Sequence, residues 1–322
     1  MSKTVLTPLT QVLNDGILTR TELKAFMRRS NGPALRNLAA WVVLLCSTTA
    51  LIYVTKNTLW FWPMMFVQGI IIVHHFSLQH ECVHYTAFKT RWLNNLIGNI
   101  CGVIIILPHQ YFRYEHCDHH TYTQVPGQDP ELIELPKSIT GYLAYLSAVP
   151  YWRVKFGSIF RNAAGIFNDA ERSFIPSDVR PSLVWEARTY LLVYCLIGVS
   201  SVLAGWTGAL WYWLIPLFLG EPVMRFIRMT EHVGKPAIKS MKENTRTTYV
   251  FRPAQFLCWN MNYHAEHHYV SSVPFHALPS LHEKLKTVIS VEPHGYWGAH
   301  VDILEQLLGK RKRADQIRET NE

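Results

Sequence analysis

The sequence predicts an all-α integral membrane protein with four transmembrane helices in two hairpins and a helical cap rich in histidine. Composition is the first reason, because 49% of the 322 residues are hydrophobic and only 17% are charged, whereas soluble domains average about 25% charged residues. The second reason is that nine histidines form three short clusters and one single position, and each cluster lies just beyond an apolar segment. The net charge of +8 therefore indicates a surface that faces a membrane, and no nucleic acid partner is expected.

Four segments approach the length of about 17–25 apolar residues that crosses a bilayer. They are residues 38–54, 58–73, 189–206 and 209–224. The connections at 55–57 and 207–208 are so short that each pair of segments forms a hairpin, and both tips face the same side. Tryptophans near these tips are typical of an aromatic belt at one membrane interface: Trp60, Trp62, Trp206, Trp211 and Trp213.

Basic residues lie away from the hairpin tips, which hold only Lys56. The positive-inside rule then places both termini, the central loop and the histidine clusters on the cytoplasmic side. We expect three parts: a cytoplasmic N-terminal segment at 1–37, a membrane domain at 38–285 and a cytoplasmic C-terminal tail at 286–322.

Two further segments are expected to be helices that do not cross the membrane. Residues 92–108 are apolar enough for a fifth crossing, but they lie between the first and second histidine clusters. A crossing there would put these clusters on opposite faces of the bilayer, so we expect a buried, interfacial or re-entrant helix. Residues 139–152 are expected to form one interfacial helix on the cytoplasmic side.

The histidine clusters have the spacing of metal ligands. They read HECVH at 80–84, HCDHH at 116–120 and HAEHH at 264–268, and His232 stands alone. Because positions i, i+3 and i+4 share one stripe of a helix, each cluster can aim its imidazoles at one point. Neutral imidazole suits iron, zinc or copper, and eight or nine such groups are too many for one ion, so we expect two metal ions. The candidate ligands in these clusters are His80, His84, His116, His119, His120, His264, His267 and His268.

The first cluster also matches another kind of metal enzyme. His80, Glu81 and His84 form the H-E-x-x-H signature in which two histidines hold zinc and the glutamate is the general base of a metalloprotease. A catalytic zinc needs three protein ligands and a water, so a zinc protease would leave six clustered histidines unused. Glu81 and His84 also form one E-x-x-H element of a carboxylate-bridged di-iron bundle, but such a bundle needs a second copy, and the sequence has none.

The three motifs H-x-x-x-H, H-x-x-H-H and H-x-x-H-H, in this order and flanked by two hairpins, resemble the membrane fatty acid desaturase and hydroxylase superfamily over residues 38–285. The stretches at 128–132, 263–268 and 273–279 resemble its bacterial desaturase-like members. The resemblance implies a cytoplasmic site with two iron ions, dioxygen as co-substrate and a lipid-like or acyl substrate. It also implies that His232 is a ligand, and the fourth span can continue as a helix past Pro222 to place His232 over the cap. The acyl-CoA branch has an asparagine four residues before this histidine, whereas Arg228 stands here, so that branch's substrate is not carried over.

The reaction that the resemblance implies is O2-dependent desaturation of a fatty acyl or other aliphatic chain. Hydroxylation on the same scaffold is the alternative, because the two reactions differ only after the first hydrogen is removed. The sequence has no H-P-G-G haem motif of cytochrome b5. A separate electron donor of the ferredoxin or cytochrome type is therefore expected, together with the lipid bilayer as surroundings.

Polar residues near the clusters are candidates for orienting the ligands. Carboxylates one residue from a cluster histidine can accept the other ring N–H: Glu81, Asp118, Glu231 and Glu266. Asp129 and Asn262 are candidates on the resemblance. The remaining histidines are expected to be structural or solvated: His74, His75, His109, His276, His282, His294 and His300.

Overall fold

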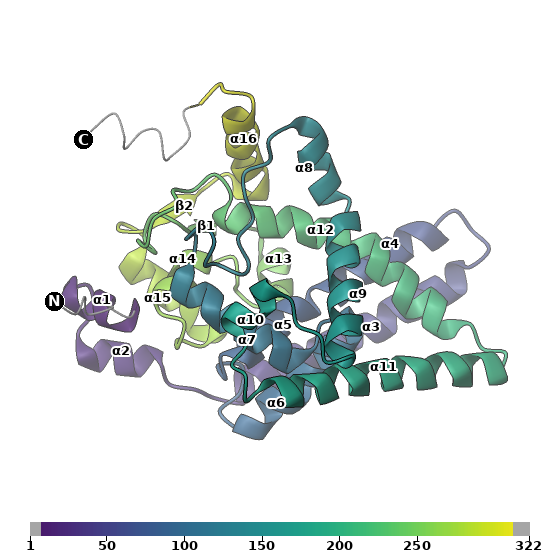
Figure 1. Cartoon of the computed structure of the whole chain (residues 1–322). Helices are drawn as coiled ribbons and strands as arrows, with labels where there is room; N and C mark the ends of the chain where they lie inside the picture. Colours follow the sequence, from purple (N-terminus) through teal and green to yellow (C-terminus); the bar gives the residue numbers. More distant parts are fainter. Residues whose placement is uncertain (1–7, 312–322) are drawn as a thin grey trace.

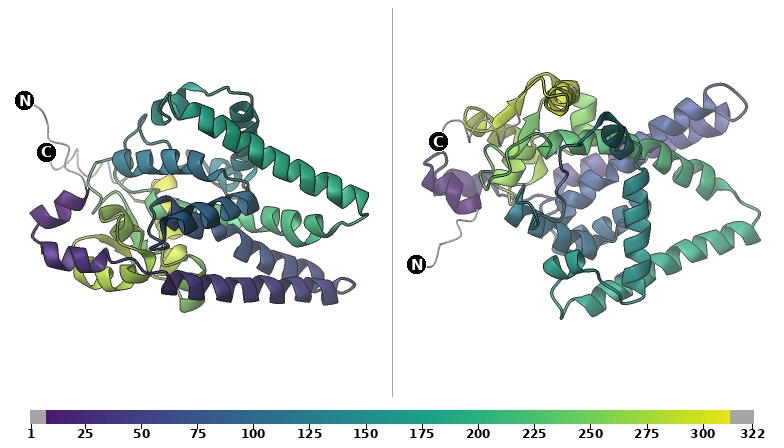
Figure 2. Two further views of the ribbon diagram at one scale, coloured as in Figure 1. Left: turned by 90° about the horizontal axis from the view of Figure 1, so that it is seen from below. Right: turned by 45° about the horizontal axis from the view of Figure 1, so that its top comes forward.

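The computed structural model describes residues 8–311, so the outermost parts of the predicted N-terminal segment and C-terminal tail lie outside the described residues. Helices dominate the fold (Figure 1). The long helices extend to one side with both hairpin tips at the same end, and the short elements gather at the other end (Figure 2). The long helices are α3 (Gly32–Thr55), α4 (Phe61–Val73), α11 (Arg180–Leu203) and α12 (Ile215–His232), which a π-helical turn, η1 (Leu210–Leu214), precedes.

Three helices are long and apolar enough to cross a membrane, or up to four if a bent pair counts as one span. They are α3, α11 and the continuous stretch Phe61–Val83, in which α5 (His75–Val83) follows α4 directly. Only 17% of the apolar windows of α3 and α11 are buried, against 61% for Phe61–Val83. The outward faces of α3 and α11 are therefore apolar and suit contact with lipid.

The predicted fourth span, residues 209–224, is not among these helices. Its residues do form a helix that continues past Pro222 to His232, as expected. However, α12 carries Glu221, Arg225, Arg228 and Glu231 within its 18 residues. These charges lie mainly in the second half of α12, whereas the predicted span at 209–224 contains one charged side chain, Glu221.

Helices α4 and α12 cross at two glycines. A Cβ atom on Gly69 would lie 2.2 Å from the carbonyl oxygen of Pro216, and one on Gly220 would lie 2.3 Å from the carbonyl oxygen of Gly69. Any larger residue would push the two backbones apart. This close approach, which is typical of helix contacts in membranes, sets the position of α12 and hence of His232 at its end.

A buried glutamine joins the two hairpins. The Gln68 side chain accepts a hydrogen bond from Thr48 Oγ1 at 2.6 Å and donates one to the Tyr212 carbonyl at 2.6 Å. Tyr212 lies in the π-helical turn, where the regular helical pattern of backbone bonds is broken. Gln68 therefore donates to a backbone carbonyl that would destabilise the fold if it were left unpaired away from water.

The segment predicted as one interfacial helix over 139–152 is two helices, α8 (Ile139–Leu146) and α9 (Val149–Ala163). Ala148 between them has a φ of 61°, and Pro150 follows in the first turn of α9. A left-handed residue and a proline together end one helix and start another in a new direction.

A small parallel sheet is the one departure from an all-helical fold among the described residues. Strand β1 (Arg246–Thr248) pairs with β2 (Ser290–Glu292), Arg246 lying opposite Ser290. Residues 286–311, expected as a tail, contain β2 and α16 (Gly295–Leu307), and Ile303 of α16 packs with Met229 of α12. The remaining elements are α1 (Pro8–Asn14), α2 (Arg20–Phe26), α6 (Arg91–Ile105), α7 (His109–Tyr122), α10 (Asp169–Phe174), α13 (Arg252–Leu257), α14 (His264–Tyr269), η2 (Phe275–Ala277) and α15 (Leu278–Leu285).

Candidate metal centre

A sharp corner brings the first two histidine clusters together. Helices α6 and α7 are bent by 98° relative to each other, because Ile106 has a left-handed φ of 58° and Pro108 precedes the first turn of α7. Gln79 Nε2 donates a hydrogen bond of 2.8 Å to the Leu107 carbonyl and ties this corner to α5. The chain therefore turns back at the corner, and the clusters of α5 and α7 share one site.

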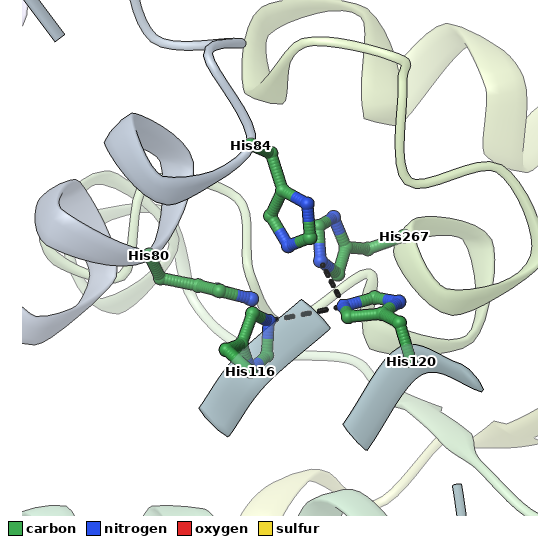
Figure 3. A group of neighbouring side chains, drawn as sticks. All are labelled: His80, His84, His116, His120 and His267. Carbon is green, nitrogen blue, oxygen red and sulfur yellow. Dashed lines mark hydrogen bonds between the residues drawn. The ribbon is translucent and has the colours of Figure 1, made fainter. Parts of the chain in front are cut away.

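Five histidines from three helices form the first group, with ligand atoms all within 4.8 Å of one another. The Nε2 atom of His120 lies 3.0 Å from that of His116 and 3.1 Å from that of His267. Figure 3 shows the five rings directed toward a common point. The members are His80, His84, His116, His120 and His267.

Four other histidines form the second group. The Nε2 atom of His264 lies 3.0 Å from that of His232 and 3.1 Å from that of His268. The ligand atoms of His119, His232 and His268 also lie within 4.8 Å of one another. The second and third clusters are thus divided between the two groups, and the expectation that each cluster aims at one point is wrong for them. The reason is that adjacent residues on a helix point about 100° apart, so His119 and His120 diverge, as do His267 and His268.

The donor atoms of both groups fit a cation. Burial, with the neighbouring imidazoles, holds the pKa of His264, His267 and His268 well below its usual range, so these rings are neutral. His80, His84 and His119 each have a buried Nε2 atom without a hydrogen-bond partner. Lone pairs that face one another in a dry site repel, and a bound metal ion removes the repulsion.

Two carboxylates orient candidate ligands of the second cluster. Asp129 Oδ1 accepts from His119 Nδ1 at 2.7 Å, and Glu131 Oε1 accepts from His116 Nδ1 at 2.7 Å. These bonds place the proton on Nδ1 and leave each Nε2 lone pair free for a metal. Burial alone would raise the pKa of Glu131, but His116, His119 and Arg228 hold it well below its usual range.

The third group of possible ligand atoms adds a carboxylate. The ligand atoms of Glu231, His232 and His264 lie within 4.8 Å of one another. Glu231 Oε2 is 3.7 Å from His264 Nε2 and 2.5 Å from Arg228 Nη1.

Three of the other four predicted orienting residues bond the surrounding chain instead of a proposed ligand. Glu81 Oε2 accepts from the Phe275 N–H at 3.1 Å, and the Asn262 side chain donates to the Thr248 carbonyl at 3.1 Å. Glu266 accepts from Thr247 Oγ1 and pairs with His282 Nδ1. Asp118 is partly buried, but His119 pairs with Asp129 instead. The H-E-x-x-H pair His80 and His84 lies in a group with three further histidines, and the Glu81 carboxylate accepts from the backbone at Phe275.

Histidines outside the clusters have other surroundings. His74 and His75 bond carbonyls of their own helix, and His109 contacts Arg113. His300 bonds both Tyr142 and the Phe226 carbonyl. His282 pairs with Glu266, His276 is half-buried and His294 is exposed.

Sequence reasoning missed three side chains at the site. Glu131 is one of them, and the signal for it is a second carboxylate two residues after Asp129. Thr123 Oγ1 lies 3.2 Å from His268 Nδ1. Arg228 binds both Glu131 and Glu231, and no local pattern indicates such a contact across 97 residues.

Two cavities meet at Phe76 beside the histidines. A groove of about 320 Å³ is lined by apolar residues, among them Phe76, Leu107, Phe112 and Val154, and by charged residues that include Glu131 and Arg228. A cavity of about 20 Å³ is lined by Phe76, by His80 of the first group and by His264 of the second. Phe76 therefore lines both the groove and a small cavity that touches both groups.

The fold and site define a helical membrane protein with buried histidine clusters that could hold metal ions. The chain belongs to the fatty acid desaturase family, whose model matches residues 57–299. It is a fatty acid desaturase-like oxidoreductase.

Relatives in bacteria, animals and plants act on lipids. The chain is 24% identical over 259 residues to an sn-1 acyl-lipid omega-3 desaturase (ferredoxin) of Nostoc sp. (strain 36), covering 71% of this chain and 67% of that protein. It is 23% identical over 248 residues to a human (Homo sapiens) sphingolipid delta(4)-desaturase, covering 74% and 71%. It is 23% identical over 273 residues to a chloroplastic omega-6 fatty acid desaturase of Spinacia oleracea, covering 78% and 60%.

Proposed function

We propose that this protein is an O2-dependent desaturase of a fatty acyl or other aliphatic chain, with two iron ions held by nine histidines. The observation that carries the proposal is the convergence of buried imidazole Nε2 atoms into two adjacent groups. The proposed ligands of one iron are His80, His84, His116, His120 and His267, and those of the other are His119, His232, His264 and His268.

The irons, when bound, supply with dioxygen the oxidising power that an unactivated C–H bond requires and that side chains lack. The chain supplies position and a dry environment. Asp129 and Glu131 hold His119 and His116 in the tautomer that presents Nε2. Burial of every proposed ligand except His84, which is partly exposed, keeps water from the reacting atoms.

The groove beside Phe76 supports a lipid-like substrate, because its apolar wall can bury an aliphatic chain next to the histidines. A separate donor of the ferredoxin or cytochrome type would deliver the electrons, and the ferredoxin-dependent relative in Nostoc supports this assignment. Hydroxylation on this scaffold would begin with the same hydrogen removal, so product analysis must separate the two reactions.

The test combines metal analysis with lipid profiling. We expect purified protein to hold about two irons per chain, as its two groups of donors imply. Cells that express it should gain an unsaturated lipid only when oxygen is supplied. One zinc per chain and no oxygen requirement would instead support a metalloprotease, and a hydroxylated product would support hydroxylation.

The proposed orientation places residues 1–36, 75–187 and 226–322 in the cytoplasm. Single cysteines introduced at Lys56 and Thr207, in the hairpin tips, should then react with a membrane-impermeant maleimide from outside intact cells. A cysteine at Lys137, in a loop on the side of the histidines, should react only after permeabilisation. Labelling of position 137 from outside would reverse the orientation.

A further inference from the structure

Glu231 lies on the inner side of the second histidine group, whereas a carboxylate that only orients a ligand lies on the outer side. An orienting group accepts the N–H on the far side of a ligand ring, as Asp129 does for His119. Glu231 instead approaches the inner side, where its Oε2 faces the Nε2 atom of His264 at 3.7 Å. That Nε2 atom is the one on which His232 and His268 converge.

The distances match those between ligands of one ion. Imidazole and carboxylate bonds to a first-row divalent metal are about 2.0–2.2 Å long, so adjacent ligands are about 3 Å apart and opposite ligands about 4.2 Å apart. The Nε2 atoms of His232 and His268 lie 3.0 and 3.1 Å from that of His264, the spacing of adjacent ligands. The 3.7 Å between Glu231 and His264 lies between the two limits.

Arg228 fixes the carboxylate in this place. Its Nη1 donates to Glu231 at 2.5 Å and its Nη2 donates to Glu131 at 2.6 Å. Glu131 in turn binds His116 of the first group. The Arg228 guanidinium therefore connects Glu231, beside the second group, to Glu131, which orients the His116 ring of the first group. Both of its bonds are charge-assisted and geometrically restrictive.

Charge balance favours the same arrangement. Nine neutral imidazoles leave the full charge of two metal ions in a buried site, which is costly unless anions lie close by. The first group has Glu131 at His116, and the second has Asp129 at His119. The second group contains one histidine fewer than the first, and Glu231 would supply both its fifth donor and a negative charge.

We propose that Glu231 is a carboxylate ligand of the second metal ion and that Arg228 is the residue that positions it. The proposal rests on the two-iron function above and deepens it, because the two ions then differ in ligand chemistry: five imidazoles on one, four imidazoles and a carboxylate on the other.

Glu231→Gln tests the proposal, since glutamine keeps the size of the side chain and an oxygen for Arg228 but removes the anionic donor. In isotope-enriched ferrous protein, we expect two Mössbauer quadrupole doublets, of which one changes in the variant and the other does not. The iron of the altered site should also be lost to a chelator more readily, by more than the roughly 10–100-fold that loss of an orienting group costs. Arg228→Gln should alter the same doublet to a smaller extent.

Glu221→Gln is the matched control. Glu221 is another buried glutamate of α12 that pairs with an arginine, Arg225, at 2.8 Å, and it belongs to no group of possible metal ligands among the described residues. It should leave both doublets unchanged.

Unchanged doublets in Glu231→Gln would overturn the ligand assignment while leaving the two-iron proposal intact. Absence of two irons from the unaltered protein would defeat the proposed function itself. If Glu231→Gln fails to accumulate in membranes, Glu231→Asp tests the same assignment. The aspartate side chain is one methylene shorter, and this displacement of the oxygen shifts the doublet only if that oxygen binds the metal.

Discussion

Replacing His120 by alanine is expected to abolish turnover and to lower the iron content from about two ions to about one or fewer per chain. His120 is the centre of the first group, since its Nε2 lies 3.0 Å from that of His116 and 3.1 Å from that of His267. Its ring also stacks on His268 of the second group, with 4.1 Å between the centroids. Loss of this ring removes one proposed ligand and opens a space between the two histidine groups.

Iron analysis of the membrane-inserted variant and product analysis in the same preparation measure this effect. His294→Ala is the control, because His294 is exposed and lies outside both histidine groups, and it should change neither quantity. Normal turnover with two irons in the His120 variant would contradict the ligand assignment of the first group.

The second large effect is expected for Asp129→Asn, which should lower metal affinity or activity by about 10–100-fold. Asp129 accepts from His119 Nδ1, from the Gln124 N–H at 2.8 Å and from the Glu131 N–H at 2.9 Å. An asparagine presents one N–H2 group where the aspartate presents only acceptors. It therefore disturbs either the His119 tautomer or the loop that places Glu131.

Asp118→Asn is the comparison for this prediction. Asp118 precedes His119 in the sequence, but the ring of His119 pairs with Asp129. We expect the Asp118 variant to keep nearly full iron content and activity in parallel assays. A larger loss for Asp118→Asn than for Asp129→Asn would show that the second cluster is oriented by its sequence neighbour and not by the loop.

Local sequence patterns predicted the helices and the candidate ligands but placed some boundaries wrongly. The apolar segments at 38–54 and 189–206 correspond to α3 and α11. The segment at 209–224 corresponds to η1 and the first part of α12, and its crossing of a membrane stays a prediction. The expected helix at 139–152 is divided at Ala148, whose left-handed backbone is not indicated by its residue type.

Local sequence patterns also failed to indicate which residues orient the proposed ligands. Sequence proximity to a histidine indicated Glu81, Asp118, Glu231 and Glu266 as candidates, but the carboxylates that accept ring N–H groups from proposed ligands are Asp129 and Glu131. On a helix, a residue next to a ligand points about 100° away from it. Partners therefore come more readily from a loop that crosses the site.

Residue type and helical spacing are local properties, so the sequence by itself indicated the eight clustered candidate ligands and predicted two ions, and the family resemblance added His232. Only the tertiary structure decided how the histidines are shared, with His120 and His267 in one group and His119 and His268 in the other. That division depends on the 98° corner between α6 and α7 and on the close crossing of α4 and α12 at Gly69 and Gly220. Both involve contacts between distant parts of the chain. The free energy that favours them comes from side-chain packing, which cannot be predicted from the local spacing of residues.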